Sequence, residues 1–277
     1  MERLTIGQMA KLNHITEQTL RFYDKIGLLT PDTVDAQTGY RYYSVSQIAY
    51  LDMIQYMKSL GMKLRDIQKQ LELRDPTLIK SILWEREHRI DSEIRLLRQQ
   101  KRAIERTLQS YQHYETAPPD GTIVLEYLPE RWIYCIDAGV NFYDYGIEAY
   151  EEMLRKLKES LITDHLPQIY FCNAGTILLQ KELEQRRFYS SRIFVLVDRE
   201  FVADQLTVSV PASTYLCIYC NEFEKEKEYI HRLLDKIESE GYKIAGDYIC
   251  EVIAEFPLLD RKKRGMFLRL QIPIKFN

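Results

Sequence analysis

The chain has 277 residues, with 38 Lys and Arg against 41 Asp and Glu, which gives a formal net charge of −3. This length accommodates two domains. No apolar run approaches the roughly 20 residues of a membrane-spanning helix, and the N-terminus lacks the basic and apolar regions of a signal peptide. Five cysteines without an export signal indicate reduced thiols. We therefore expect a cytoplasmic protein with no membrane partner.

Residues 4–64 predict a short helix, a turn, a second helix, a Gly-containing hairpin and a third helix. Thr5 and Gln8 have the spacing of a capping box at the start of the first helix. Thr16 can cap the second helix, and Gly27 marks its end. A helix-turn-helix followed directly by a hairpin rich in Arg and Tyr is typical of a winged DNA-binding domain.

The second helix and the hairpin carry side chains suited to DNA. Arg and Gln can pair with the edges of guanine and adenine in the major groove, and aromatic residues can contact the backbone and thymine methyls. Taken alone, Arg21 could be a solvated helix arginine, and the hairpin tyrosines Tyr40, Tyr42 and Tyr43 could merely pack the hairpin. The candidate DNA-binding residues are Thr16, Gln18, Arg21, Phe22, Tyr23, Lys25, Tyr40, Arg41 and Lys58.

Residues 77–114 form a long charged segment without Gly or Pro. Apolar residues recur in it every seven positions, which is the heptad pattern of a coiled coil. The alternative is a long helix packed against its own chain. Glu87 and Lys101 interrupt the pattern, and the Pro- and Gly-containing stretch 116–121 ends the helix. The heptad residues are Leu83, Ile90, Leu97, Ile104 and Tyr111, with Ile94 and Leu108 in the alternate seam.

The remaining residues contain an internal repeat. Residues 129–136 resemble residues 211–218, at an offset of 82 positions. In each half we expect a preceding strand, a following amphipathic helix and two further strands. Two similar α+β halves would form one antiparallel sheet, and the cleft where they meet is the natural ligand site. The expected elements are strands 123–128 and 206–210, helices 146–161 and 222–240, and strands 168–179, 192–197, 247–256 and 266–274.

This part of the chain is rich in tyrosine, and Glu251 lies within an apolar strand. A buried carboxylate is costly unless it is paired or neutral, and a cationic aromatic ligand could supply the pair. Alternatively, Glu251 faces solvent or pairs with a local Arg, and the tyrosines belong to the core. The candidate ligand-binding residues are Glu251, Tyr127, Tyr134, Tyr143, Tyr145, Tyr170, Tyr215, Tyr219 and Phe267.

Cys217 and Cys220 have the spacing of a metal or redox site, but residues three apart in a strand face opposite sides. We expect buried structural cysteines, no metal and no cofactor. Residues 1–75 carry ten Lys and Arg against nine Asp and Glu, so DNA affinity must come from the placement of charge. Residues 119–277 carry twenty against twenty-six, which argues against a second nucleic-acid surface.

Residues 4–75 resemble the N-terminal domain of MerR-family transcription regulators. The resemblance lies in the stretches 6–11, 19–29 and 39–43, and Phe22 departs from it because many relatives have Tyr there. The layout of the C-terminal part, its repeat and the stretch 246–251 resemble the GyrI-like effector domain of BmrR-type multidrug regulators.

The resemblance implies an α+β fold: an N-terminal winged helix-turn-helix (1–75), a long dimerisation helix with its linker (76–118) and a GyrI-like antiparallel sheet with helices (119–277). It implies a homodimer joined by an antiparallel coiled coil, with Glu251 at the base of a pocket for lipophilic, cationic aromatic compounds. Such a dimer would sit on an overlong promoter spacer and, by bending and untwisting the DNA, let RNA polymerase use both promoter elements.

Two other functions remain open at this point. The same domains could make a simple repressor. GyrI-like domains can also hydrolyse small molecules, with Glu251 as a general base. Because the sequence contains no evident nucleophile–base arrangement or metal cluster, we expect a protein that is not an enzyme.

Overall fold

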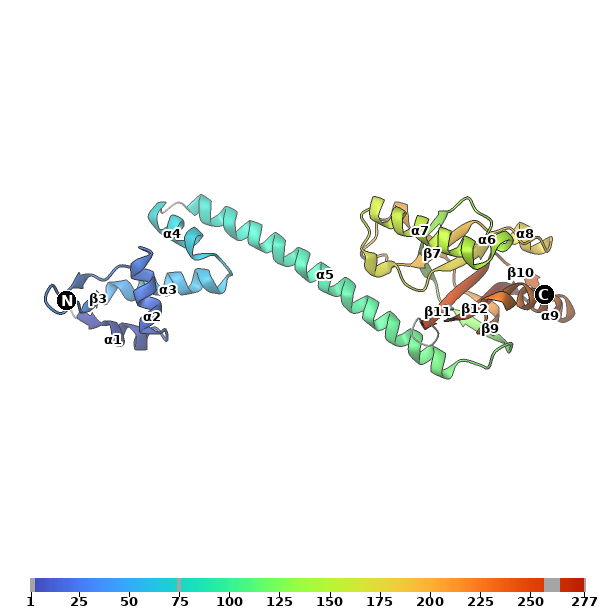
Figure 1. The fold of residues 1–277 in the computed structure, drawn as a ribbon, viewed down its shortest axis with the longest axis horizontal. Coiled ribbons are helices and arrows are strands. Elements are labelled where there is room, and N and C mark those ends of the chain that lie inside the picture. Colours follow the sequence, from blue (N-terminus) through green and yellow to red (C-terminus); the bar gives the residue numbers. More distant parts are fainter. Residues whose placement is uncertain (1–2, 74–75, 257–264, 277) are drawn as a thin grey trace. The chain divides into compact units, whose positions relative to one another are not determined.

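The computed structural model describes residues 3–73, 76–256 and 265–276. The chain forms two compact units, Met1–Arg95 and Leu96–Asn277, and the long helix contributes to both of them. Figure 1 shows the elements in chain order. The boundaries of the three predicted domains stay a prediction.

The N-terminal unit contains the predicted helix-turn-helix and wing. A strand at the N-terminus, which the sequence did not indicate, completes a three-stranded antiparallel sheet in the order β1-β3-β2. A further helix that was not expected follows the third one. The elements are β1 Arg3–Thr5, α1 Ile6–Leu12, α2 Glu17–Lys25, β2 Thr33–Val34, β3 Arg41–Ser44, α3 Ser46–Ser59 and α4 Leu64–Leu73.

The predicted caps explain where these helices begin. The backbone amide of Gln8 donates to Thr5 Oγ1 at 3.2 Å, and the backbone amide of Thr5 donates to Gln8 Oε1 at 2.8 Å, so the capping box is confirmed. Thr16 Oγ1 accepts from the amide of Thr19 at 3.0 Å at the start of α2. Gly27, at φ 74°, follows α2 in the left-handed region that favours glycine.

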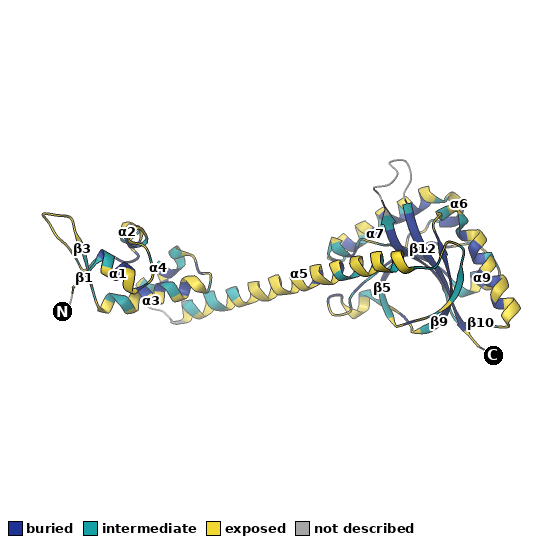
Figure 2. Cartoon of the chain, turned by 90° about the horizontal axis from the view of Figure 1, so that it is seen from below, coloured by how far each residue is buried: buried dark blue, intermediate teal, exposed yellow. Residues whose placement is uncertain are grey.

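The segment predicted as a coiled coil is one helix, α5 Pro76–Thr116. Near its start, Ile79, Ile82 and Leu83 pack against the core of the N-terminal unit. Further along, the heptad stripe is exposed, as the yellow middle of α5 in Figure 2 shows. The stripe comprises Ile90, Ile94, Leu97, Ile104, Leu108 and Tyr111, with exposed fractions between 40% and 62%.

The C-terminal unit is built on one antiparallel sheet, as predicted, which has nine strands in the described residues. The strand order is β4-β9-β12-β11-β6-β7-β5-β8, with β10 beside β12. The two predicted halves exchange their first strands, because β4 pairs with β9 and β8 pairs with β5. They also meet where β6 pairs with β11, with Leu178 opposite Tyr248. The strands are β4 Ile123–Leu128, β5 Arg131–Asp137, β6 Gly175–Leu178, β7 Arg192–Leu196, β8 Val208–Val210, β9 Ser213–Cys220, β10 Lys243–Ile244, β11 Tyr248–Phe256 and β12 Gly265–Lys275.

Helices α7 and α9 cover one face of this sheet, which we call the helix face. Their apolar residues, including Leu157 of α7 and Leu233 of α9, pack there with Ile218 and Leu270 from the strands. The helices are α6 Phe142–Tyr145, α7 Ile147–Thr163, α8 Gln180–Glu184 and α9 Glu226–Glu240, with 3₁₀ turns at Gln168–Tyr170, Asp204–Leu206 and Phe223–Lys225.

The other face, which we call the inner face, carries alternate residues of the same strands, such as Ile133, Tyr219 and Glu251. Cys217 belongs to this face and Cys220 to the helix face. Both cysteines are free and buried, which confirms the interpretation from strand geometry.

One predicted strand is wrong in its first half. Of residues 168–179, only Gly175–Leu178 form a strand, and Gln168–Tyr170 form a 3₁₀ turn. Asn173 takes a positive φ of 51° between the two, which breaks the extended run. Its side-chain amide donates to Ser110 Oγ at 3.2 Å and to the carbonyl of Ile253 at 3.1 Å, contacts that fix this bend.

Candidate functional site

The outer surface of α2 is the first candidate site. Gln18, Arg21, Phe22 and Lys25 are all exposed, and their spacing places them on one side of the helix. Among the described residues, Arg21 forms an ion pair with Glu17 alone, at 3.9 Å, and both side chains are more than half exposed. A pair this open contributes little and leaves the guanidinium free to contact a base edge.

The hairpin between β2 and β3 forms a defined wing beside this helix. Asp35 accepts hydrogen bonds from the amides of Gln37 at 2.9 Å and Thr38 at 2.7 Å, which hold the pKa of its carboxyl below the ordinary value. Tyr40 is exposed in this turn. Arg41 Nε donates to Asp24 Oδ2 at 2.8 Å and thereby ties the wing to α2.

The structure therefore gathers most of the predicted DNA-binding residues on one exposed surface. Arg41 is partly buried in its ion pair. Tyr23 differs from the rest: its ring is 2% exposed, and its hydroxyl accepts from Lys58 Nζ at 3.3 Å. Only that hydroxyl is left for a contact with DNA. The DNA contacts themselves stay a prediction.

Glu251, on the inner face, is the centre of the second candidate site. It is 8% exposed, and its Oε2 accepts from Arg131 Nη1 at 2.8 Å, Arg269 Nη2 at 2.8 Å and Gln271 Nε2 at 2.7 Å. Burial raises the pKa of Glu251, but the two guanidinium groups and the hydrogen bonds outweigh burial and hold it below the ordinary value.

The expectation that Glu251 lacks a protein partner is therefore wrong, and the alternative, pairing with a local Arg, is confirmed. The sequence had indicated neither arginine as its partner. Arg269 could have been found, because in β12 it shares strand parity with Phe267 and Gln271 inside an apolar run. Arg131 is the first residue of β5, so no apolar residues of the same strand precede it to indicate that it is buried.

The same network reaches the long helix. Arg269 Nη1 donates to Glu126 Oε2 at 3.0 Å, and the Tyr219 hydroxyl donates to Glu126 Oε1 at 2.6 Å. Because the Tyr219 hydroxyl donates its proton to Glu126, its oxygen accepts a hydrogen bond from His113 Nε2 of α5 at 2.7 Å. Burial, followed by the positive charge of Arg269, lowers the pKa of His113. Hydrogen bonds thus run without a break from α5 to Glu251.

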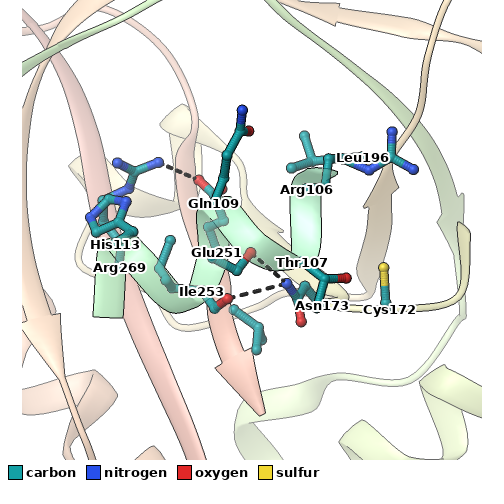
Figure 3. A pocket seen from close by; sticks show the side chains of 12 residues that line it. Arg106, Thr107, Gln109, His113, Cys172, Asn173, Leu196, Glu251, Ile253 and Arg269 are labelled. Atoms are coloured by element: carbon teal, nitrogen blue, oxygen red, sulfur yellow. Dashed lines mark hydrogen bonds and ion pairs between the residues drawn. The ribbon is translucent and has the colours of Figure 1, made fainter. Parts of the chain in front are cut away.

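A cavity of about 180 Å³ lies between the last turns of α5 and the inner face; we call it the α5 cavity (Figure 3). Arg106, Gln109 and His113 line it from α5, and Glu251 and Arg269 line it from the sheet. Its size is close to the roughly 150 Å³ of a cavity that holds benzene. Its walls carry both polar and apolar surface, and two buried nitrogens of its lining residues, Arg106 Nη2 and Arg269 Nε, have no hydrogen-bond partner within the described residues.

The predicted aromatic residues do not form one pocket, so that expectation is wrong. Successive residues of a strand face opposite sides, which divides the tyrosines between the two faces. Tyr219 stacks on Phe267 with 5.6 Å between centroids, and the Tyr215 ring lies 5.4 Å from Arg131. The others lie apart: the hydroxyls of Tyr134, Tyr143 and Tyr170 contact Asp164, Glu226 and Asp198, while Tyr127 and Tyr145 are about 70% exposed.

Within the described residues, no group of three or more His, Cys, Asp or Glu side chains is placed to hold a metal ion. In the same part of the chain, no helix is long and apolar enough to span a membrane.

Comparison with known proteins assigns the chain to a family. Residues 4–73 match the model for MerR HTH family regulatory proteins. The "Multidrug-efflux transporter 2 regulator" of Bacillus subtilis is 26% identical over 92% of this chain and 91% of its own length. The "HTH-type transcriptional regulator ZntR" of Escherichia coli is 30% identical over 36% of this chain and 75% of its own length.

Among solved structures, the cryo-EM structure of an EcmrR–DNA complex aligns with a TM-score of 0.43 at 18% identity, covering 99% of this chain and all of the other. The N-terminal match, together with the identity to a regulator covered over three quarters of its length, decides the assignment. The chain belongs to the MerR family of transcription regulators and is similar to multidrug-efflux regulators within it.

Proposed function

We propose that this protein binds promoter DNA as a homodimer and changes the activity of RNA polymerase in response to lipophilic aromatic compounds, as an activator. DNA binding is supported by the exposed face of α2 beside the wing, which carries Gln18, Arg21, Phe22 and Lys25. The Arg41–Asp24 ion pair fixes the wing against this helix, so both elements can contact one site without reorganising.

The exposed stripe of α5 supports the dimer. Six apolar side chains at heptad spacing are each at least 40% exposed in the single chain. Large exposed apolar patches on regular elements mark interaction surfaces, and heptad spacing suits a second helix of the same kind. The partner is therefore α5 of a second copy, and the family resemblance implies that the two helices pack as an antiparallel coiled coil. Two copies would place two α2 helices on two half-sites.

The contacts of the C-terminal unit support control by a ligand. The chain of hydrogen bonds from Glu251 through Arg269, Glu126 and Tyr219 ends at His113 of α5. A ligand that moves these strands changes the environment of the same helix that joins the dimer. Bending and untwisting DNA costs several kcal/mol, so a ligand that favours the distorting conformation of the dimer would switch transcription.

Selection of bound sequences from a random pool of double-stranded DNA tests the proposal. The wild-type protein should enrich a sequence with two related half-sites, since a dimer presents two α2 helices. The Arg21→Ala variant should bind the enriched sequence less tightly by roughly 1–3 kcal/mol and lose preference at one position per half-site. Recovery of no common sequence by the wild type would refute the proposal.

A further inference from the structure

Glu226, the first residue of α9, is a buried carboxylate on the helix face of the sheet. It is 2% exposed. Its Oε1 accepts hydrogen bonds from the Tyr143 and Tyr248 hydroxyls, both at 2.9 Å. Its Oε2 is buried and has no hydrogen-bond partner in the described part of the chain, where Glu226 also forms no ion pair within 4.0 Å.

Glu226 and Glu251 differ in the charge of the groups that surround them. Glu251 faces two guanidinium groups at hydrogen-bond distance, so a cationic ligand would add little to its stabilisation. Glu226 has two neutral hydroxyl donors and one unsatisfied oxygen. Burial therefore dominates and raises its pKa to about 7. A buried acid of this kind gains most from a partner of positive charge.

Beside Glu226 lies a cavity of about 340 Å³, which we call the α6 cavity. Its volume lies within the range of about 300–1,000 Å³ that is usual for small-molecule sites. Its apolar lining comes from Phe142, Tyr143, Ile147 and Phe223. The rings of Phe142 and Phe223 meet edge to face with 5.1 Å between centroids, so aromatic surface is available for stacking and for cation–π contact.

Glu226 is itself one of the residues that line this cavity, and the charged residues Glu224 and Lys227 line it as well. Tyr143 lines it from α6, a single turn. Lys227 Nζ lies 5.5 Å from the centroid of the Tyr143 ring and donates to the Tyr143 carbonyl at 2.8 Å, so its ammonium already has a partner. A ligand in the α6 cavity would therefore lie beside the Glu226 side chain.

We propose that Glu226, together with Tyr143 and Tyr248, binds the positively charged end of a lipophilic aromatic cation whose apolar part occupies the α6 cavity. This inference rests on the proposed function and assigns its ligand to the helix face, with Glu226 in place of Glu251 as the residue that selects charge. The sequence contained a signal for it: Glu226 lies on the apolar stripe of α9, three, four and seven residues before Tyr229, Ile230 and Leu233.

Calorimetry on the full-length protein tests the assignment with a matched pair of probes, (4-hydroxyphenyl)trimethylammonium and the neutral 4-tert-butylphenol. Glu226→Gln keeps the shape of the side chain and an acceptor for the tyrosines but removes the charge. Its affinity for the cation should fall at least tenfold, while its affinity for the neutral phenol should change less than twofold. Glu228→Gln, an exposed acid in the same turn of α9, should change neither.

A second measurement on the wild type does not depend on any variant folding. Below pH 7 the cationic probe keeps both its ammonium charge and a protonated phenol, so its affinity should rise between pH 5 and pH 7 as Glu226 ionises, and the neutral phenol should show no such rise. Burial raises the pKa of the thiols and phenols close to Glu226, so they stay neutral over this range; they are Tyr143, Tyr248, Cys220 and Cys250. The charged residues Glu224 and Lys227 also line the cavity.

Three results would overturn the assignment: no binding of the cation by the wild type, equal losses for the two probes in Glu226→Gln, or a selective loss of the cation in Glu251→Gln instead. The DNA selection described above keeps this inference separate from the proposed function. Sequence-specific DNA binding without cation binding would refute only the site. Cation binding without sequence-specific DNA binding would refute the proposed regulatory function but not the proposed cation site.

Discussion

The Glu226→Gln substitution should change how the stability of the C-terminal unit depends on pH. Burial raises the pKa of this carboxyl from 4.5 to about 7 in the folded protein. The folded state then holds its proton more tightly than the unfolded state does. The resulting stabilisation is fully present below pH 4.5, is lost as pH rises towards 7, and is absent above that.

The magnitude follows from the size of the rise. Each tenfold change in a proton equilibrium is worth about 1.4 kcal/mol, so a rise from 4.5 to about 7 corresponds to about 3 kcal/mol. Most of it, about 2–3 kcal/mol, should be lost between pH 5 and pH 8. In Glu226→Gln this loss is missing, because glutamine does not ionise. Between pH 5 and pH 8 the variant should therefore lose less stability than the wild-type protein does.

Urea unfolding followed by tryptophan fluorescence measures this difference. The chain has two tryptophans, and a Trp84→Phe background leaves Trp132 of β5 as the reporter of the C-terminal sheet. Comparison of Glu226→Gln with Glu228→Gln in that background cancels the pH dependence of all other groups. Parallel pH profiles for the two variants would show that the Glu226 carboxyl ionises as easily in the folded protein as in the unfolded chain, and would refute the reasoning.

Three further predictions concern the other sites. Replacing both Ile94 and Leu97 with Asp should give monomers in sedimentation with much weaker binding to the selected DNA, because charges would enter the apolar seam; an unchanged dimer would contradict the coiled coil. Glu251→Gln should destabilise the C-terminal unit by about 3–5 kcal/mol in urea unfolding, since Arg131 loses its carboxylate partner and Arg269 keeps that of Glu126 but loses that of Glu251; near-neutral stability would show that the ion pairs contribute little. Arg41→Ala should weaken binding to all DNA sequences and reduce its salt dependence, and a loss confined to one base position would argue against a wing contact with the backbone.

Local sequence signals predicted the N-terminal unit well. The capping box of Thr5 and Gln8, the cap at Thr16 and the glycine at position 27 act within a few residues of one another, so the sequence alone reveals them. The heptad stripe of α5 was visible for the same reason. The strand β1 escaped notice because its three residues owe their extended form to pairing with β3, which lies about forty positions away.

The ligand site could not be predicted in the same way, because its contacts join distant strands. Glu251 bonds to Arg131 across 120 positions, and no pattern within one strand shows that pairing. Strand parity within the repeat does separate Tyr134, which faces the helices, from Tyr215 and Tyr219, which lie on the inner face. The buried acid of α9 is visible in the sequence as a charge on an apolar stripe, but helix periodicity alone does not show whether such a charge is buried or solvated.

The central claim is that a ligand bound in the C-terminal unit changes the shape of DNA held by the N-terminal unit. Fluorescence energy transfer between dyes at the two ends of the selected DNA measures that shape directly. With wild-type protein bound, (4-hydroxyphenyl)trimethylammonium should change the end-to-end transfer, and with Glu226→Gln bound at saturation it should not. Identical transfer with and without the cation, on DNA fully occupied by wild-type protein that binds the cation, would contradict the account.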